Sequence, residues 1–166
     1  MKRSSEAALQ LIAELESDFA FIRESEARNL AMVERLARTG SPDEFDFAAH
    51  GYTLHNLYNS FEAYFLRIAK FFENNLGDTG WHRDLLERMT LDIEGLRVQL
   101  FPRAFAHRLE ELLKFRHRFR NIYKNTLDPR KMDAVQEAAN HIADDFAVYH
   151  ERYIAFLRAL AEELRD

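Results

Sequence analysis

Cysteine is absent from this chain of 166 residues. Its absence excludes disulfide bonds, thiolate nucleophiles and cysteine-ligated metal sites, and it is typical of proteins of the reducing cytoplasm. Long apolar runs are also absent, since none approaches the roughly 18 residues of a membrane span. The start MKRSSEAALQLIAELESDF becomes acidic where a secretory signal would stay apolar. We therefore expect a cytoplasmic protein with no membrane segment.

Glycine and proline are scarce, with five and three residues. Few positions can therefore form the turns that a multi-stranded sheet needs, whereas the abundant alanine, leucine, glutamate and arginine favour helices. The length suits one domain with a genuine core. We predict a single all-α domain over residues 1–166, an antiparallel, mostly up-and-down bundle of about four or five helices.

Apolar side chains recur every three to four positions and predict the individual helices. The first covers residues 5–38 and ends at Gly40. Ser41 is the expected N-cap of the second, with Pro42 at its first position and Glu44 completing a capping box. The other expected segments are a continuation of this helix to about Leu76, a short helix Trp81–Met89, a loop or broken helix Thr90–Phe101, a helix opened by Pro102, and a last helix opened by Asp128 and Pro129 that nearly reaches the C-terminus. The helical spacing of most of the 14 phenylalanines and six tyrosines places them in the core.

Acidic residues are missing from one stretch of this acidic protein, whose formal net charge is -5. Between Leu112 and Leu127 lie five of the 23 Lys/Arg residues and no Asp/Glu, which leaves 18 bases against 28 acids elsewhere. The stretch reads KFRHRFRNIYK from Lys114 to Lys124. Positive charge gathered in one place on an acidic body indicates a site for a polyanion.

Arg116 lies in the middle of the apolar stripe of its helix, within about 60° of Phe105, Leu109 and Phe119. Two interpretations stay open. Its guanidinium forms an internal ion pair, for which Glu62 is a candidate, or it lies in a cleft where it binds a phosphate.

The spacing of Arg116, Asn121 and Tyr123 is one part of a wider resemblance. Three sequence blocks carry this resemblance, in the order LHNLYNSFEAYFLRIAKFFE (54–73), GWHRDLLERM (80–89) and FRHRFRNIYKNTLDP (115–129). The third block contains Arg116, Asn121 and Tyr123. Together the three blocks resemble HEPN-domain proteins of the HepT-like toxin type, whose motif is arginine, four residues, histidine, one residue, tyrosine. The chain departs from that motif only at Asn121.

This resemblance implies a helical bundle that dimerises and cleaves RNA without metal or cofactor, as the toxin partner of a minimal nucleotidyltransferase antitoxin. It assigns phosphate binding to Arg116 and regulation by adenylylation to Tyr123. Residues Arg116 and Asn121 are about 140° apart on an ideal helix, so a site that needs both is more easily built across a dimer. The RNA contacts expected from the basic stretch are Lys114, Arg118, Arg120 and Lys124.

Asn121 puts the catalytic step in question, because an amide cannot exchange a proton near neutral pH. Three outcomes follow: His117, one helical turn earlier, supplies the base; electrostatic stabilisation alone gives slow cleavage; or the protein is a non-catalytic module that binds a nucleotide, RNA or a nucleotidyltransferase. A plain structural bundle is a further alternative. We expect no metal site, since His50 and His55 are five apart and do not share a helix face.

Overall fold

The structure is a computed structural model that describes residues 3–73, 81–121 and 127–165. These residues form six α-helices and the loops between them, without a β-strand. The helices are α1 (Ser5–Arg38), α2 (Glu44–Phe72), α3 (Trp81–Arg88), α4 (Arg103–Arg120), α5 (Pro129–Ala139) and α6 (Ile142–Glu163). The expected all-α class is confirmed.

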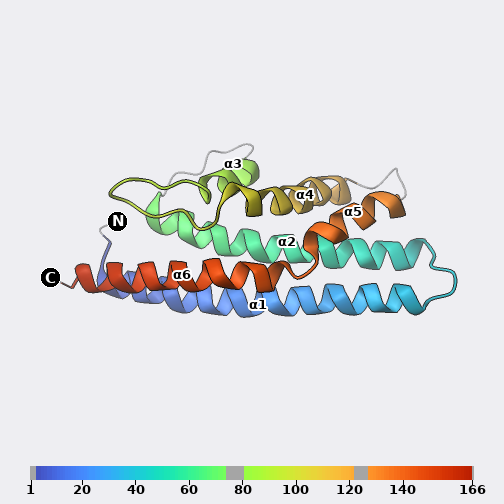
Figure 1. Cartoon of the computed structure of the whole chain (residues 1–166), viewed down its shortest axis with the longest axis horizontal. Coiled ribbons are helices and arrows are strands. Elements are labelled where there is room, and N and C mark those ends of the chain that lie inside the picture. The colour runs from blue at the N-terminus through green and yellow to red at the C-terminus, as the bar shows by residue number, and fades with distance from the viewer. Residues whose placement is uncertain (1–2, 74–80, 122–126, 166) are drawn as a thin grey trace.

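Four long helices run alternately up and down the molecule. Helices α1 and α2 form an antiparallel hairpin, α6 lies along the N-terminal half of α1, and α4 lies along α2 (Figure 1). The short helix α3 contacts α2 and α4, and α5 connects the end of α4 to α6. The mostly up-and-down antiparallel bundle expected from the sequence is therefore the observed architecture.

Aromatic rings from several helices meet around Phe146 of α6 in the core. The ring centroids of Phe61 and Tyr64 on α2 both lie 5.2 Å from that of Phe146. Phe105 of α4 stacks at 5.9 Å. This confirms the expected aromatic core, although Phe45 is an exception with 75% of its surface exposed.

The start of α2 differs from the expected one by two residues. Asp43, not Ser41, is the N-cap, because its carboxylate accepts hydrogen bonds from the backbone of Phe45 and Asp46. The side chain of Asp46 accepts in return from the backbone of Asp43, which completes the capping box. Pro42 consequently precedes the helix. Helix α2 ends at Phe72, and Leu76 lies outside the described residues.

The predicted last helix is broken in two. Asp128 caps α5 with Pro129 in its first turn, as expected, but α5 ends at Ala139 and His141 adopts a left-handed backbone with φ 56°. The carboxylate of Glu26 on α1 accepts a hydrogen bond of 2.5 Å from the backbone N–H of Ala143, in the first turn of α6. This cap comes from a distant helix, so local periodicity could not predict the break.

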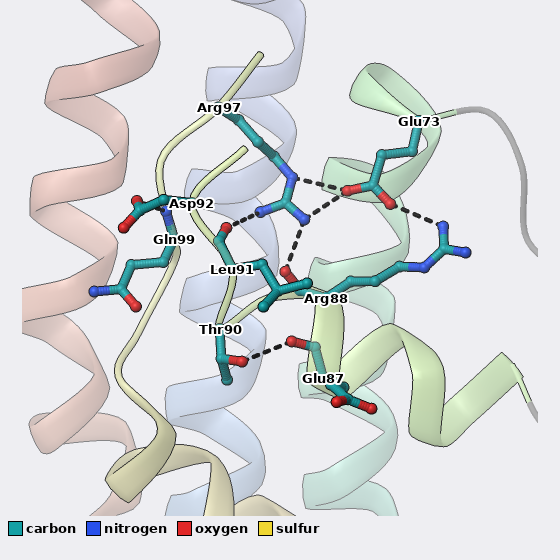
Figure 2. Close-up of polar contacts among 8 residues, drawn as sticks. All are labelled: Glu73, Glu87, Arg88, Thr90, Leu91, Asp92, Arg97 and Gln99. Carbon is teal, nitrogen blue, oxygen red and sulfur yellow. Dashed lines mark hydrogen bonds and ion pairs between the residues drawn. The ribbon is translucent and has the colours of Figure 1, made fainter. Parts of the chain in front are cut away.

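The segment between α3 and α4 is a loop organised by a buried arginine (Figure 2). Arg97 donates to Glu73 Oε1 through Nε at 2.8 Å and Nη2 at 2.5 Å. It also donates to the backbone carbonyls of Arg88 at 2.7 Å and Leu91 at 3.1 Å. Gly95, with φ 71°, lies in the turn closed by Ile93 and Arg97. Of the two alternatives predicted here, the loop is observed.

Gly51 allows α4 to approach α2 closely. A Cβ atom at this position would lie 2.8 Å from Cε2 of Phe119. We expect Gly51→Ala to lower the free energy of unfolding by about 1–3 kcal/mol, because overpacking forces neighbouring side chains to shift. Urea denaturation measures this. Gly40→Ala is the matched control, since its Cβ meets nothing within 4 Å, and an equal effect of both changes would contradict the packing argument.

Candidate functional site

The C-terminal half of α4 carries the basic stretch and has two different faces. Arg116 points into the protein and is 7% exposed, whereas His117, Arg118 and Arg120 are exposed. Neither Arg118 nor Arg120 has an ion-pair partner in the part of the chain that the structure describes. This half of α4 therefore presents free positive charge above one buried arginine.

Arg116 is held by two residues of α2. Its Nε donates to Asn59 Oδ1 at 2.7 Å, and its Nη2 lies 3.5 Å from Glu62 Oε1. The internal ion pair with Glu62, one of the two interpretations open from sequence, is therefore formed. The buried Nη1 has no hydrogen-bond partner among the described residues, so one N–H pair of the guanidinium is uncommitted.

The hydrogen bonds from Arg116 also determine the state of His55. Arginine can only donate, so Asn59 accepts through Oδ1 and has its amide Nδ2 left to donate to His55 Nε2, 3.0 Å away. His55 is then the neutral tautomer with its proton on Nδ1. Burial lowers the pKa of His55, with further lowering by Arg116 and Arg120, in agreement with a neutral ring.

Glu62 connects Arg116 to a histidine of α3. Nδ1 of His82 lies 2.6 Å from Glu62 Oε2 and donates to it. Glu62 is 6% exposed, so both of its oxygens are engaged inside the protein. The rings of His82 and His117 lie edge to face, with centroids 5.9 Å apart. Residues of α2, α3 and α4 thus meet at one place.

His117 lies next to both buried and solvent-facing charged groups. Partial burial lowers the pKa of His117, the charges of Arg116 and then His82 lower it further, and Glu62 opposes them. Because the ordinary pKa of histidine is about 6.5, a lowered pKa leaves His117 unprotonated at neutral pH. An unprotonated imidazole can accept a proton.

Tyr58 adds a buried hydroxyl below this cluster. It is fully buried, and its hydroxyl has no hydrogen-bond partner within the described ranges. Burial raises the pKa of Tyr58, as does Glu62, so the phenol stays neutral. Nδ1 of His55 is likewise buried without a hydrogen-bond partner among the described residues. Two buried polar atoms of α2 close to Arg116 therefore remain without a partner in this part of the chain.

The remaining predicted site residues divide into two groups. Asn121 is the C-cap of α4, and its side-chain amide donates to the backbone carbonyl of His117 at 2.9 Å. Lys114 pairs with Glu111 at 2.8 Å on the surface. Tyr123 and Lys124 lie outside the described residues. The structure therefore brings together Arg116 and His117 but does not bring Asn121 to the buried arginine within one chain.

Sequence reasoning missed Asn59 and assigned no chemical role to His82. One signal was available, because His55, Asn59 and Glu62 are spaced by four and three residues and so share one face of α2. For His82 no such signal exists, since its neighbours come from other helices.

A second cluster of ionisable groups lies at the start of α6. Ligand atoms of Glu26, His141 and Asp144 lie within 4.8 Å of one another. Glu26 already accepts from Ala143, and Asp144 pairs with Arg23 at 2.9 Å. Both carboxylates therefore have structural roles, Glu26 as a helix cap and Asp144 in an ion pair.

One family of known proteins matches this chain. The family model described as "HepT-like protein" matches residues 49–157, well over half of the chain. This range includes the three blocks noted in the sequence. Searches of curated proteins and of solved structures gave no match. None of the helices that the structure describes has the length and hydrophobicity of a membrane span.

Proposed function

Since this chain belongs to the HepT-like family, we propose that it acts on RNA as one component of a toxin–antitoxin pair and cleaves RNA without a metal ion. The observation that carries this proposal is the end of α4. There, Arg118 and Arg120 are exposed and have no ion-pair partner among the residues that the structure describes. They lie next to the buried Arg116 and to His117, whose ring meets that of His82. Cations bind the phosphates of RNA, and neighbouring imidazoles can move its protons.

Arg116 acts in this proposal as a fixed positive charge. Asn59 and Glu62 hold its guanidinium in place, and Nη1, which has no partner among the described residues, can still donate hydrogen bonds. A preorganised charge stabilises the dianionic phosphorus centre of the transition state without a cost of reorganisation. Attraction to the phosphate backbone of RNA, which does not depend on sequence, comes in this proposal from Lys114, Arg118, Arg120 and Lys124.

The proposed assembly is a homodimer with a minimal nucleotidyltransferase as antitoxin. Arg116 faces inward and Asn121 is exposed at the helix end. A site that uses both is therefore composed more easily from two copies of α4. Tyr123 is the proposed target of adenylylation by the partner.

The test is cleavage of RNA by the purified protein in the presence of a chelator. We expect products with 2′,3′-cyclic phosphate ends, because the ribose hydroxyl attacks without a metal. Arg116→Ala is expected to abolish cleavage, and Arg116→Lys, which keeps the charge but not the fork, to reduce the rate by about 10²-fold or more. Arg158→Lys on α6 is the control and should leave the rate unchanged. Cleavage undiminished in both Arg116 variants would refute the assignment.

One observation favours a second function, a non-catalytic module that binds RNA or a nucleotidyltransferase. Asn121 stands at the position of the family's histidine and is committed to capping α4. If this alternative holds, the natural protein binds RNA without cleaving it, and Asn121→His creates cleavage. Efficient cleavage by the natural protein would exclude it.

A further inference from the structure

We propose that His82 and His117 form the proton-transfer pair of this site, with His117 as the base that takes the proton of the ribose 2′-hydroxyl and His82 as the acid that protonates the leaving 5′ oxygen. This inference rests on the proposed ribonuclease function and deepens it. It explains how a HepT-like site can cleave RNA with asparagine instead of histidine at position 121.

The two rings come from different helices and meet at the surface. Their centroids are 5.9 Å apart at an interplanar angle of 76°. His82 is the second residue of α3, and His117 lies in the last turn of α4. Exposed Arg118 and Arg120 follow on the same helix, so RNA drawn to these cations is brought next to both imidazoles.

Glu62 gives His82 the arrangement of an acid. The carboxylate accepts from Nδ1 at 2.6 Å, which orients the ring and leaves Nε2 to exchange a proton with substrate. The charged ring is compatible with this contact, since it becomes an ion pair with Glu62 when His82 is protonated. Arg116 shares Glu62 through the other carboxylate oxygen, so the phosphate-stabilising charge and the acid are held by one residue.

His117 has the surroundings of a base. The charged and titratable groups that act on it are Arg116 and Arg120 from α4, His82 from α3 and Glu62 from α2. Partial burial and then the charges of Arg116, His82 and Arg120 lower the pKa of His117, and Glu62 opposes them only in part, so the ring is neutral at pH 7. Asn121 takes no part in proton transfer.

The proposed reaction balances within the pair. His117 removes the 2′-hydroxyl proton while the 2′ oxygen forms a bond to phosphorus. The bond from phosphorus to the 5′ oxygen breaks, and the leaving oxygen takes the proton of the His82 imidazolium. The products are a 2′,3′-cyclic phosphate and a 5′-hydroxyl, and one proton has moved in effect from His82 to His117.

Asparagine substitutions separate chemistry from support. The amide nitrogen of asparagine occupies the place of Nδ1, so His82→Asn retains the donor to Glu62 but lacks Nε2. We expect His82→Asn and His117→Asn each to slow cleavage by about 10²-fold or more, with unchanged urea denaturation. His107→Asn is the matched control, because His107 is an exposed α4 histidine whose Nδ1 also lies against a carboxylate, Glu110, at 3.2 Å.

A substrate with sulfur in place of the bridging 5′ oxygen identifies the acid. A thiolate leaves without protonation, so cleavage of this RNA by His82→Asn should return to within about threefold of the natural protein, while His117→Asn stays slow. Loss of rate in His82→Asn without rescue by the sulfur substrate would overturn the role of His82 as acid.

The pH profile identifies the base. The cleavage rate should rise with pH as His117 loses its proton, with a midpoint below the ordinary histidine value of about 6.5, and His117→Asn should remove this limb. If the natural protein does not cleave RNA, both the ribonuclease function and the pair are refuted. If the natural protein cleaves RNA and His82→Asn cleaves the oxygen-bridged and the sulfur-bridged RNA at the same rate as the natural protein does, only the proton-transfer pair is refuted.

Discussion

Replacement of Glu62 by alanine is expected to lower the free energy of unfolding by about 3 kcal/mol or more and to abolish RNA cleavage. Glu62 is 6% exposed and accepts contacts from two basic side chains, Arg116 at 3.5 Å and His82 at 2.6 Å. Its removal leaves Arg116 buried without its counter-charge, which is costlier than the loss of an exposed pair. It also releases His82 from its orientation. Urea denaturation and the chelator-resistant cleavage assay measure the two effects.

Glu62→Gln separates the charge of this residue from its shape. Glutamine keeps an oxygen acceptor for His82 Nδ1, so we expect a smaller loss of stability than with alanine. The negative charge beside Arg116 is lost, so cleavage should still fall. Glu14→Ala is the control, because Glu14 pairs with Arg67 at 3.1 Å with 35% of its side chain exposed and should change stability by less than about 1 kcal/mol. Equal stability losses at the two glutamates would contradict a buried network.

Arg97→Ala is the second change with a large expected effect, a loss of about 3 kcal/mol or more in the free energy of unfolding. The Arg97 side chain is fully buried and donates to Glu73 and to two backbone carbonyls (Figure 2). Alanine leaves these acceptors without their donor in a place that water cannot easily reach. The loop that leads into α4 is then held less firmly. Urea denaturation measures the loss.

Arg165→Ala provides the comparison for Arg97. Its ion pair with Glu162, 3.0 Å long, is exposed on the last turn of the chain, so the change should cost no more than about 0.5 kcal/mol. Arg97→Met tests the polar contribution further, since methionine fills much of the space but donates nothing. If Arg97→Met is as stable as the natural protein, hydrogen bonding by Arg97 does not stabilise the loop.

Local patterns in the sequence predict the helices of this protein well. Period and composition indicate α1 and the starts of α4 and α5, because an amphipathic stripe and a proline near a helix start are properties of neighbouring residues. The exact cap of α2 and the break before α6 were predicted wrongly. The first is a competition among adjacent capping residues, which Asp43 wins over Ser41. The second depends on Glu26, which is 117 residues from Ala143 in the sequence.

The site divides in the same way. The sequence by itself determined the helical class, the family resemblance, the concentration of positive charge on α4 and the position of Arg116 in an apolar stripe, because each is a matter of composition or spacing along one helix. Only the tertiary structure decided which groups face Arg116. Asn59, Glu62 and His82 reach it or its partners from α2 and α3. Their roles depend on distances between helices, which the packing of the whole bundle sets and no local pattern records.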